Sequence, residues 1–466
     1  MEFYDDYSEE FDDFFIDEKA LQSKIDLSFK YLEEGQAVIQ TDFIEETIQL
    51  CLENEKFDTG LALTDKVLGI FPFNSEYWQL KGIFLNSKFD FINAYLAFEK
   101  TLTLNPTDVE SLMGKSIAEE SLDLFDDAVL SLKKVLDIEE NNEEAYFNLG
   151  TLYERDDQYE KAIEYLSKSV ELDEGYIEAW YELGFCYEYL NKLDQALNAY
   201  DKYLENDPFS YSGWYNKGIV YIKMDRFQDA INDFELSIAI NESFSSSWFN
   251  CGVSYANVDN LEKALNCFKK AVKLDGKDET LWFTLGQTYD DLNQYQNAIN
   301  SYTEAIKLYN DNFEVMLARG ICYNNIGQKS SALKDINKAL SIKPFSIEAL
   351  QLSVSINKSL GDLQSAITNC KKIIDVDKNN FTAWSRLAEM YSEIGNWVES
   401  VNSFNMCIKL KPEKASAYYE KAKRKFLKNK NTEALEYLKS SFSIHSNVRN
   451  EPVKDQSESQ STKLPK

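Results

Sequence analysis

The sequence has few of the residues that enzymes use for catalysis. It contains one histidine, His445, among 466 residues. A metal site or mechanism that needs two histidines is therefore excluded, and His-ligated zinc with it. Seven cysteines are scattered and none stands in a Cys-x-x-Cys pair, which argues against a zinc site or a disulfide framework. We expect no enzyme activity, no metal, no cofactor and a reducing, cytoplasmic location.

Basic charge and long apolar runs are also scarce. The chain has 49 Lys and Arg against 79 Asp and Glu, a formal net charge of -30. Such a polyanion is not expected to bind nucleic acid, because phosphate contacts require Lys and Arg. No apolar run approaches the roughly 18 residues that span a bilayer. The acidic start, MEFYDDYSEEFDDFF, lacks the basic and apolar parts of a secretory signal, so we expect no direct membrane insertion.

Repetition, in contrast, is abundant. The stretch AWYELGFCYEYLNKLDQALNAYDKYLENDP returns 34 residues later as GWYNKGIVYIKMDRFQDAINDFELSIAINE. The register holds without insertion from about residue 41 to about residue 448, which predicts twelve repeats. The repeats begin at Thr41, Ser75, Val109, Glu143, Ile177, Tyr211, Ser245, Glu279, Phe313, Ile347, Phe381 and Ala415. Below, the place of a residue is its position in its repeat, counted from these starts.

Residue types recur at fixed places. Six tryptophans stand at place 4: Trp78, Trp180, Trp214, Trp248, Trp282 and Trp384. Glycine is common at place 8, tyrosine at place 11, alanine at place 20 and proline at place 32. Places 4, 7, 8 and 11 share one face of a helix, and proline ends a helix. Each repeat is therefore predicted to form two antiparallel helices of about 13 residues.

This pattern resembles the tetratricopeptide repeat (TPR), with its Trp, Leu-Gly, Tyr, Ala, aromatic and Pro positions. The resemblance covers about 408 of 466 residues, from 41 to 448. The repeats that begin at 41, 109, 347 and 415 are degenerate, and Ile48, Ser116 and Val354 replace the glycine in three of them. The expected fold class is all-α, a right-handed α-solenoid superhelix of about twelve helical hairpins, in which neighbouring repeats bury a continuous core. Cys186, Cys251 and Cys322 are expected to belong to that core.

The resemblance implies that the first helix of each repeat lines a concave groove. Place 5 carries Phe147, Tyr181, Tyr215, Phe249 and Phe283, and place 6 carries Asn148, Glu182, Asn216 and Asn250. An asparagine side chain pairs with both groups of a peptide bond, so these asparagines could hold an extended peptide, as in TPR proteins with an asparagine ladder. The alternative is that the asparagines are solvated and the aromatics pack between repeats.

The groove charge indicates the kind of partner. Glu154, Glu178, Glu182 and Glu188 fall on this surface, where a TPR clamp for acidic tails would need Lys and Arg. A basic or neutral partner segment fits better.

The chain ends differ from the array. Residues 1–18 carry nine acidic residues interleaved with aromatics, which is typical of a disordered leader that either folds on a partner or adds solubility. Residues 19–40 are expected to form a capping helix, and residues 449–466 a polar tail. Residues 401–466 have 14 basic and 7 acidic residues, a net charge of +7. Lysines there either solvate the last repeat or support weak head-to-tail self-association.

A protein-interaction scaffold or adaptor is the function most favoured by these features. The alternative is a regulatory or targeting subunit of a separate enzyme, or of a secretion or envelope assembly complex. About 40 residues precede the repeats and about 18 follow them, which leaves no room for a catalytic domain in this sequence. A TPR array indicates how binding happens and does not identify the partner.

Overall fold

The computed structural model describes residues 18–411, 413, 415–427, 430, 433, 436–437 and 440. In these residues the regular elements are all α-helices. The leader up to residue 17, His445, the tail at 449–466 and most of the last repeat after residue 427 lie outside the described residues. The all-α prediction is confirmed.

The chain divides into two bodies, residues 1–241 and 242–466. The first body holds α1 (Glu18–Glu33), α2 (Thr41–Glu53), α3 (Phe57–Ile70), α4 (Ser75–Ser87), α5 (Phe91–Leu104), α6 (Val109–Ser121), α7 (Phe125–Ile138), α8 (Glu143–Arg155), α9 (Tyr159–Leu172), α10 (Ile177–Tyr189), α11 (Leu193–Asn206), α12 (Tyr211–Lys223) and α13 (Phe227–Ile240). Helix α1 packs on α2 and α3.

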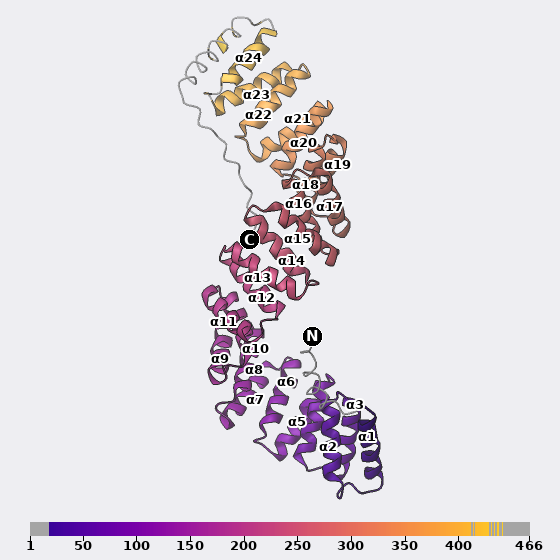
Figure 1. Cartoon of the computed structure of the whole chain (residues 1–466). Helices are drawn as coiled ribbons and strands as arrows, with labels where there is room; N and C mark the ends of the chain where they lie inside the picture. Colours follow the sequence, from indigo (N-terminus) through magenta and orange to yellow (C-terminus); the bar gives the residue numbers. More distant parts are fainter. Residues whose placement is uncertain are drawn as a thin grey trace, which may run out of the picture. The chain divides into compact units, whose positions relative to one another are not determined.

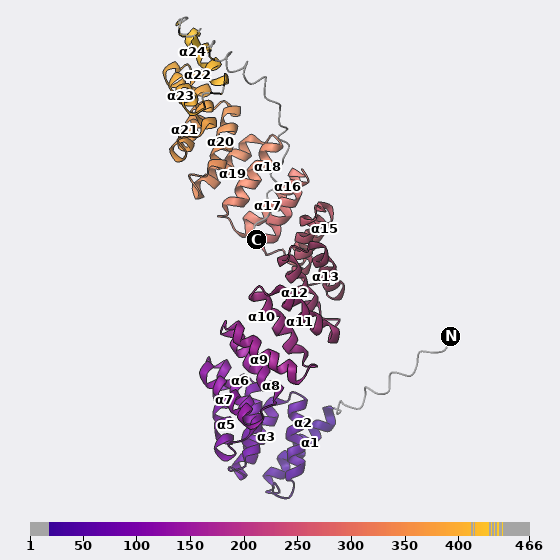
Figure 2. The same ribbon diagram turned by 90° about the vertical axis from the view of Figure 1, so that its left-hand side faces the viewer.

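The second body continues the same alternation. It holds α14 (Ser245–Asn257), α15 (Leu261–Leu274), α16 (Glu279–Asp291), α17 (Tyr295–Leu308), α18 (Phe313–Asn325), α19 (Lys329–Ile342), α20 (Ile347–Leu360), α21 (Leu363–Val376), α22 (Phe381–Glu393), α23 (Trp397–Leu410) and α24 (Ala415–Leu427). From α2 onward, even-numbered helices are the first (A) and odd-numbered helices the second (B) helix of a repeat. Within each body every helix packs against its neighbours along the chain (Figures 1 and 2).

The turn between repeats is held by two recurring hydrogen bonds. Side chains at place 34, such as Asn142 and Asp108, accept a backbone N–H in the first turn of the next A helix, which caps that helix. The place-4 tryptophans donate from Nε1 to the carbonyl six residues earlier: Trp214 donates to Pro208 at 3.0 Å and Trp180 to Glu174 at 3.0 Å. The tryptophan therefore fixes the turn as well as filling space.

The turn within a repeat places residue 15 in the left-handed backbone region. Gly327, Gly361 and Gly395 stand there with φ between 79° and 83°. Asp and Asn, which tolerate this region better than most residues, occupy it in six other repeats. Glu55 and Phe89, with φ 55° and 61°, depart from this rule.

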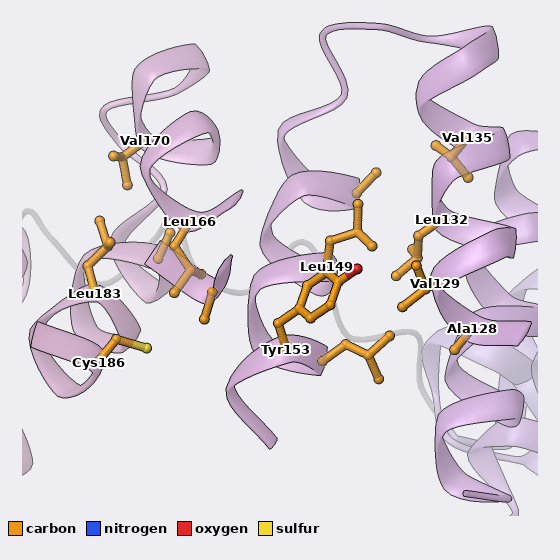
Figure 3. Close-up of a cluster of buried hydrophobic side chains, with 14 of the residues drawn as sticks. Ala128, Val129, Leu132, Val135, Leu149, Tyr153, Leu166, Val170, Leu183 and Cys186 are labelled. Atoms are coloured by element: carbon orange, nitrogen blue, oxygen red, sulfur yellow. The ribbon is translucent and has the colours of Figure 1, made fainter. Parts of the chain in front are cut away.

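The core of each hairpin depends on a pair at places 8 and 24. A Cβ atom added to Gly218 would lie 2.7 Å from Cε1 of Phe234, so the ring occupies the space that glycine leaves free. The other pairs with glycine are Gly82–Phe98, Gly150–Leu166, Gly184–Tyr200, Gly252–Phe268, Gly286–Tyr302 and Gly320–Ile336. Figure 3 shows how the hairpins then share one core, with side chains of α7, α8, α9 and α10 pointing toward one another.

Two of the degenerate repeats reverse the sizes within this pair. Val354 stands at place 8 opposite Cys370 at place 24, and both are fully buried in one cluster. Ile48 is similarly matched by the small Thr64, and both are buried. The loss of glycine in these repeats is therefore compensated by a smaller partner on the B helix.

The seven cysteines are buried and form no disulfide bond with one another. The core role predicted for Cys186, Cys251 and Cys322 is confirmed, and burial raises the pKa of the Cys186 thiol. In the described part of the chain, no helix is both long and apolar enough to cross a bilayer.

Asp233 is a buried carboxyl whose charge is poorly compensated. It lies at place 23 of α13, is 6% exposed, and its Oδ2 atom has no hydrogen-bond partner in the described structure. Burial, opposed in part by Lys217, raises its pKa to about 7. The native state therefore binds this proton more tightly than the unfolded chain does, so stability falls as the pH rises from about 4 to about 7.

Replacing Asp233 by Ser, the residue found at the same place in α7 and α17, is expected to remove this loss. The variant should gain on the order of 2 kcal/mol in free energy of unfolding above pH 7 and little near pH 4. Urea denaturation of both proteins across this pH range measures the difference. The same substitution at the exposed Asp194 of α11 is the control; an equal effect there would contradict the burial argument.

Candidate peptide-binding face

A line of polar side chains follows place 12 of four consecutive A helices in the first body. Its members, here called the acidic stripe, are Asn86 of α4, Glu120 of α6, Glu154 of α8 and Glu188 of α10. In every case the side chain interacts with the A helix of the following repeat. The stripe therefore bridges successive hairpins along the face that the A helices form.

Three members of the stripe find a hydrogen-bond or ion-pair partner there. Asn86 Nδ2 donates to the carbonyl of Gly114 at 2.7 Å. Glu120 pairs with Arg155, and Glu188 pairs with Lys223 at 2.9 Å. These two cations both stand at place 13, so one geometry serves both ion pairs.

Glu154 meets a second acid instead of a cation. Its carboxyl group shares a hydrogen bond with that of Glu182, at place 6 of α10. Burial first, and then the charge and hydrogen bond of Glu182, raise the pKa of Glu154 to about 8. Burial also raises the pKa of Glu182. Neither carboxyl group has an ion-pair partner in the described structure, so the pair holds a shared proton near neutral pH.

Glu188 extends this acidic surface by one repeat. Its side chain is only 14% exposed. Besides Lys223, it accepts a hydrogen bond from the Tyr200 hydroxyl at 3.4 Å. The carboxylate is therefore positioned by a core tyrosine on one side and by a cation on the other.

The asparagines predicted to form a ladder differ in their engagement. Asn148 of α8 is half-buried, with no hydrogen bond recorded for its side chain in the described structure. Asn216 of α12 donates from Nδ2 to the Tyr181 hydroxyl at 2.8 Å. In the second body, Asn250 donates from Nδ2 to the carbonyl of Ser246 in its own helix at 3.2 Å. Glu182, between the first two, belongs to the acid pair.

The place-5 aromatics pack within their own repeats. Tyr181 lies edge-on to Tyr203, with ring centroids 5.1 Å apart, and Tyr215 packs on Phe234 at 5.8 Å. In the second body Phe249 packs on Phe268 at 5.7 Å and Phe283 on Tyr302 at 5.9 Å. Phe147 instead contacts Tyr176 at 5.0 Å. All five rings are half-buried, so each offers only part of its surface to a ligand.

Family models match the chain in both bodies. Models described as tetratricopeptide repeat match residues 199–232, 245–278, 279–312 and 313–346. Three of these ranges begin at the first residue of α14, α16 and α18. A model described as anaphase-promoting complex, cyclosome, subunit 3 matches residues 121–203. The chain is a tetratricopeptide repeat protein.

Solved TPR structures resemble parts of the chain or most of it. A crystal structure of MamA is 29% identical and covers 35% of this chain and 95% of its own, with a TM-score of 0.34. YrrB, described as a TPR protein with an unusual peptide-binding site, is 21% identical and covers 40% and 96%, with a TM-score of 0.37. The Cut9–Hcn1 hetero-tetramer structure is 14% identical and covers 89% and 96%, with a TM-score of 0.34. A comparison with curated proteins gives no match.

The acidic charge of this TPR protein is concentrated around the stripe. Residues 101–210 contain 27 acidic and 8 basic residues, a net charge of -19 out of -30 for the whole chain. Residues 1–18 carry a further -9. The ladder prediction followed place 6 and overlooked place 12, although Asn86, Glu120, Glu154 and Glu188 recur at the same 34-residue step. That step was the signal that would have found the stripe.

The described residues contain no group of three or more His, Cys, Asp or Glu side chains arranged to hold a metal ion. The chemistry that the face offers is hydrogen bonding from amides and ion pairing from carboxylates. Both suit a peptide or protein ligand.

Proposed function

We propose that this TPR protein is an interaction scaffold that binds basic peptide segments along the acidic stripe of α6, α8 and α10. The family supports the general role, since TPR hairpins present A helices for binding. The charge of residues 101–210 supports a basic partner, because it attracts cationic segments and repels acidic ones. A regulatory or targeting subunit of a separate enzyme would use the same face.

The observation that carries the proposal is the acid pair Glu154–Glu182. Elsewhere on the stripe the chain supplies its own cation or amide donor. At the pair it supplies two carboxyl groups that compete for one proton. A Lys or Arg side chain of a partner would displace that proton and pair with both carboxylates. Asn148, on the same helix as Glu154, would hold the partner's backbone.

Selection from a displayed library of random peptides tests the proposal. The full chain is expected to enrich peptides rich in Lys and Arg over neutral and acidic ones. For a selected peptide, Glu154→Gln combined with Glu182→Gln should weaken binding about tenfold, because both acceptors of the cation lose their charge. Isothermal titration calorimetry measures the affinities. The matched control is Glu160→Gln with Glu164→Gln, which removes two exposed acids from α9 and should change affinity far less.

The pH dependence separates this site from general charge attraction. Cation binding releases the shared proton, so affinity should rise as the pH increases from about 6 to about 8. The rise should vanish in the Glu154→Gln, Glu182→Gln variant and persist in the control. Selection of neutral or acidic peptides, or an equal loss in both double variants, would refute binding at this pair.

A further inference from the structure

Helix α5 exposes apolar side chains at two neighbouring places, 18 and 22, where each of the other B helices has at most one in the described structure. Phe89, Ile92 and Leu96, here called the α5 patch, are 79%, 63% and 57% exposed. Ile92 and Leu96 stand at places 18 and 22. In the described repeats, α5 alone has apolar side chains at both places; α9 has Glu160 and Glu164 there, and α15 has Glu262 and Asn266. The patch is therefore a local feature and not a consequence of the repeat.

Phe89 occupies the left-handed position of its turn with φ 61°. A bulky residue in this region costs about 1–2 kcal/mol, and Asp, Asn or Gly fills the place in most other repeats. Its ring contacts Phe91, with centroids 6.1 Å apart, and is otherwise open to solvent. Within the described structure this side chain makes few contacts, so its exposed ring is available to a further segment.

A cavity of about 360 Å³ opens beside the patch, between α3, α4 and α5. Leu61, Trp78, Leu85 and Leu96 line its apolar part, and Lys81, paired with Asp65 at 2.7 Å, lines its polar part. Leu85 stands at place 11, where a larger tyrosine stands in most repeats. A dry cavity of about 150 Å³ can hold a benzene ring, so this one has room for an aromatic side chain.

The leader preceding α1 starts close to this cavity. Glu18, the first residue of α1, pairs with Lys56 at the start of α3, with 2.9 Å between Nζ and Oε1. Asp58, two residues further, pairs with Lys88, which precedes Phe89. Helix α1 is separated from α5 by two helix spacings of about 10 Å each. An extended chain of six or seven residues, at about 3.3 Å per residue, spans that distance. Residues 1–11, with Phe3, Tyr4, Tyr7 and Phe11, can therefore reach the patch.

Charge favours this place over the rest of the first body. Residues 56–100 hold five basic and five acidic residues, a net charge of zero. Residues 101–210, at -19, would repel the leader, which carries -9 in residues 1–18. The aromatic side chains of the leader can therefore contact residues 56–100 without net charge repulsion.

We propose that the α5 patch and the adjoining cavity are the docking site for the aromatic side chains of residues 1–11 of the same chain. The rings bury Ile92 and Leu96, and one of them enters the cavity against Trp78. The acidic residues between the rings remain in water. Because the acidic stripe lies on A helices, the leader and a basic partner can be bound together.

Photo-cross-linking in the full chain tests this proposal. The photoreactive residue p-benzoylphenylalanine replaces Leu96, and the matched control carries it at Asn198, the exposed place-22 residue of α11. Peptide mapping by mass spectrometry identifies the attached segment. An equimolar mixture of isotopically light and heavy chains shows whether the link lies within one chain. A second protein, with Phe3, Tyr4, Tyr7 and Phe11 replaced by Ser, tests the need for the rings.

The expected result is a cross-link from residue 96 to residues 1–11 within one chain, with little product at residue 198. Replacing the four aromatics should lower the yield at residue 96 about tenfold, since the apolar contact is lost. Attachment to another segment, attachment to residues 1–11 of a second chain, equal yields at both positions, or no product at residue 96 would overturn the proposal.

Discussion

Grafting the Val354–Cys370 pair onto places 8 and 24 of the repeat at 211–244 is expected to restore stability that either single substitution destroys. Phe234→Cys removes a fully buried ring and should cost about 3 kcal/mol in free energy of unfolding. Gly218→Val places new atoms within 2.7 Å of that ring and should cost about 1–3 kcal/mol. In the double variant the valine fills the space that the ring leaves.

The coupling between the two sites is the measured quantity. The double variant should be at least about 2 kcal/mol more stable than the sum of the single effects predicts. Urea denaturation followed by far-UV circular dichroism gives the free energies, taken from the first transition because repeat arrays do not always unfold in one step. Phe209→Cys, at a ring that is 79% exposed, serves as the control and should change little. Additive losses would show that the two places do not share one volume.

This compensation explains which parts of the fold were predictable. Residue types at single places were enough to predict the hairpins, because Trp, Gly, Tyr and Pro each have one steric role that repeats at a fixed step. Ile48 and Val354 weakened the pattern when place 8 was considered alone. Their repeats are intact because Thr64 and Cys370 supply the missing space from the B helix. The sizes of the residues at places 8 and 24, taken together, therefore indicate an intact hairpin where the residue at place 8 alone does not.

The binding face was less predictable for a related reason. The place-6 asparagines were chosen for their donor and acceptor groups, but Asn216 and Asn250 donate to groups of the chain itself. Whether a polar side chain is available depends on its neighbours in the next repeat, which a periodic pattern does not specify. The Glu154–Glu182 pair joins place 12 of one repeat to place 6 of the next. That contact depends on how two hairpins are offset, and so it required the structure.

Charges at place 7 follow a longer period that also needed the structure to interpret. Lys115, Lys217, Arg319 and Lys421 are 102 residues apart, which is three repeats. Each contacts place 25 of the preceding repeat: Glu99, Asp201, Thr303 and Asn405, respectively. Most other repeats have an apolar residue at place 7. Every third joint between hairpins is therefore polar, and the Lys81–Asp65 pair, which also joins place 7 to place 25 of the preceding repeat, adds one polar joint outside this period.

Arg319 is the member of this set with the strongest internal pair. Its guanidinium donates two hydrogen bonds to Asp335, at 2.6 and 2.8 Å, and a third to Thr303 at 3.0 Å. The two charged side chains are only 16% and 7% exposed. Asp335→Ala should therefore cost about 3–5 kcal/mol in free energy of unfolding, because it leaves a buried guanidinium without its counter-charge.

Replacing both partners should have a much smaller effect. Arg319→Leu with Asp335→Ala recreates the pair Leu183 and Ala199 found at places 7 and 23 of α10 and α11, both buried there. An apolar pair of this kind is often as stable as a buried ion pair or more stable by about 1–4 kcal/mol, since neither charge needs to be desolvated. Lys307→Ala, which breaks an exposed pair with Glu304, is the control and should cost less than about 1 kcal/mol. If the double variant were as unstable as Asp335→Ala alone, the arginine would stabilise the joint through Thr303 and not through its buried ion pair.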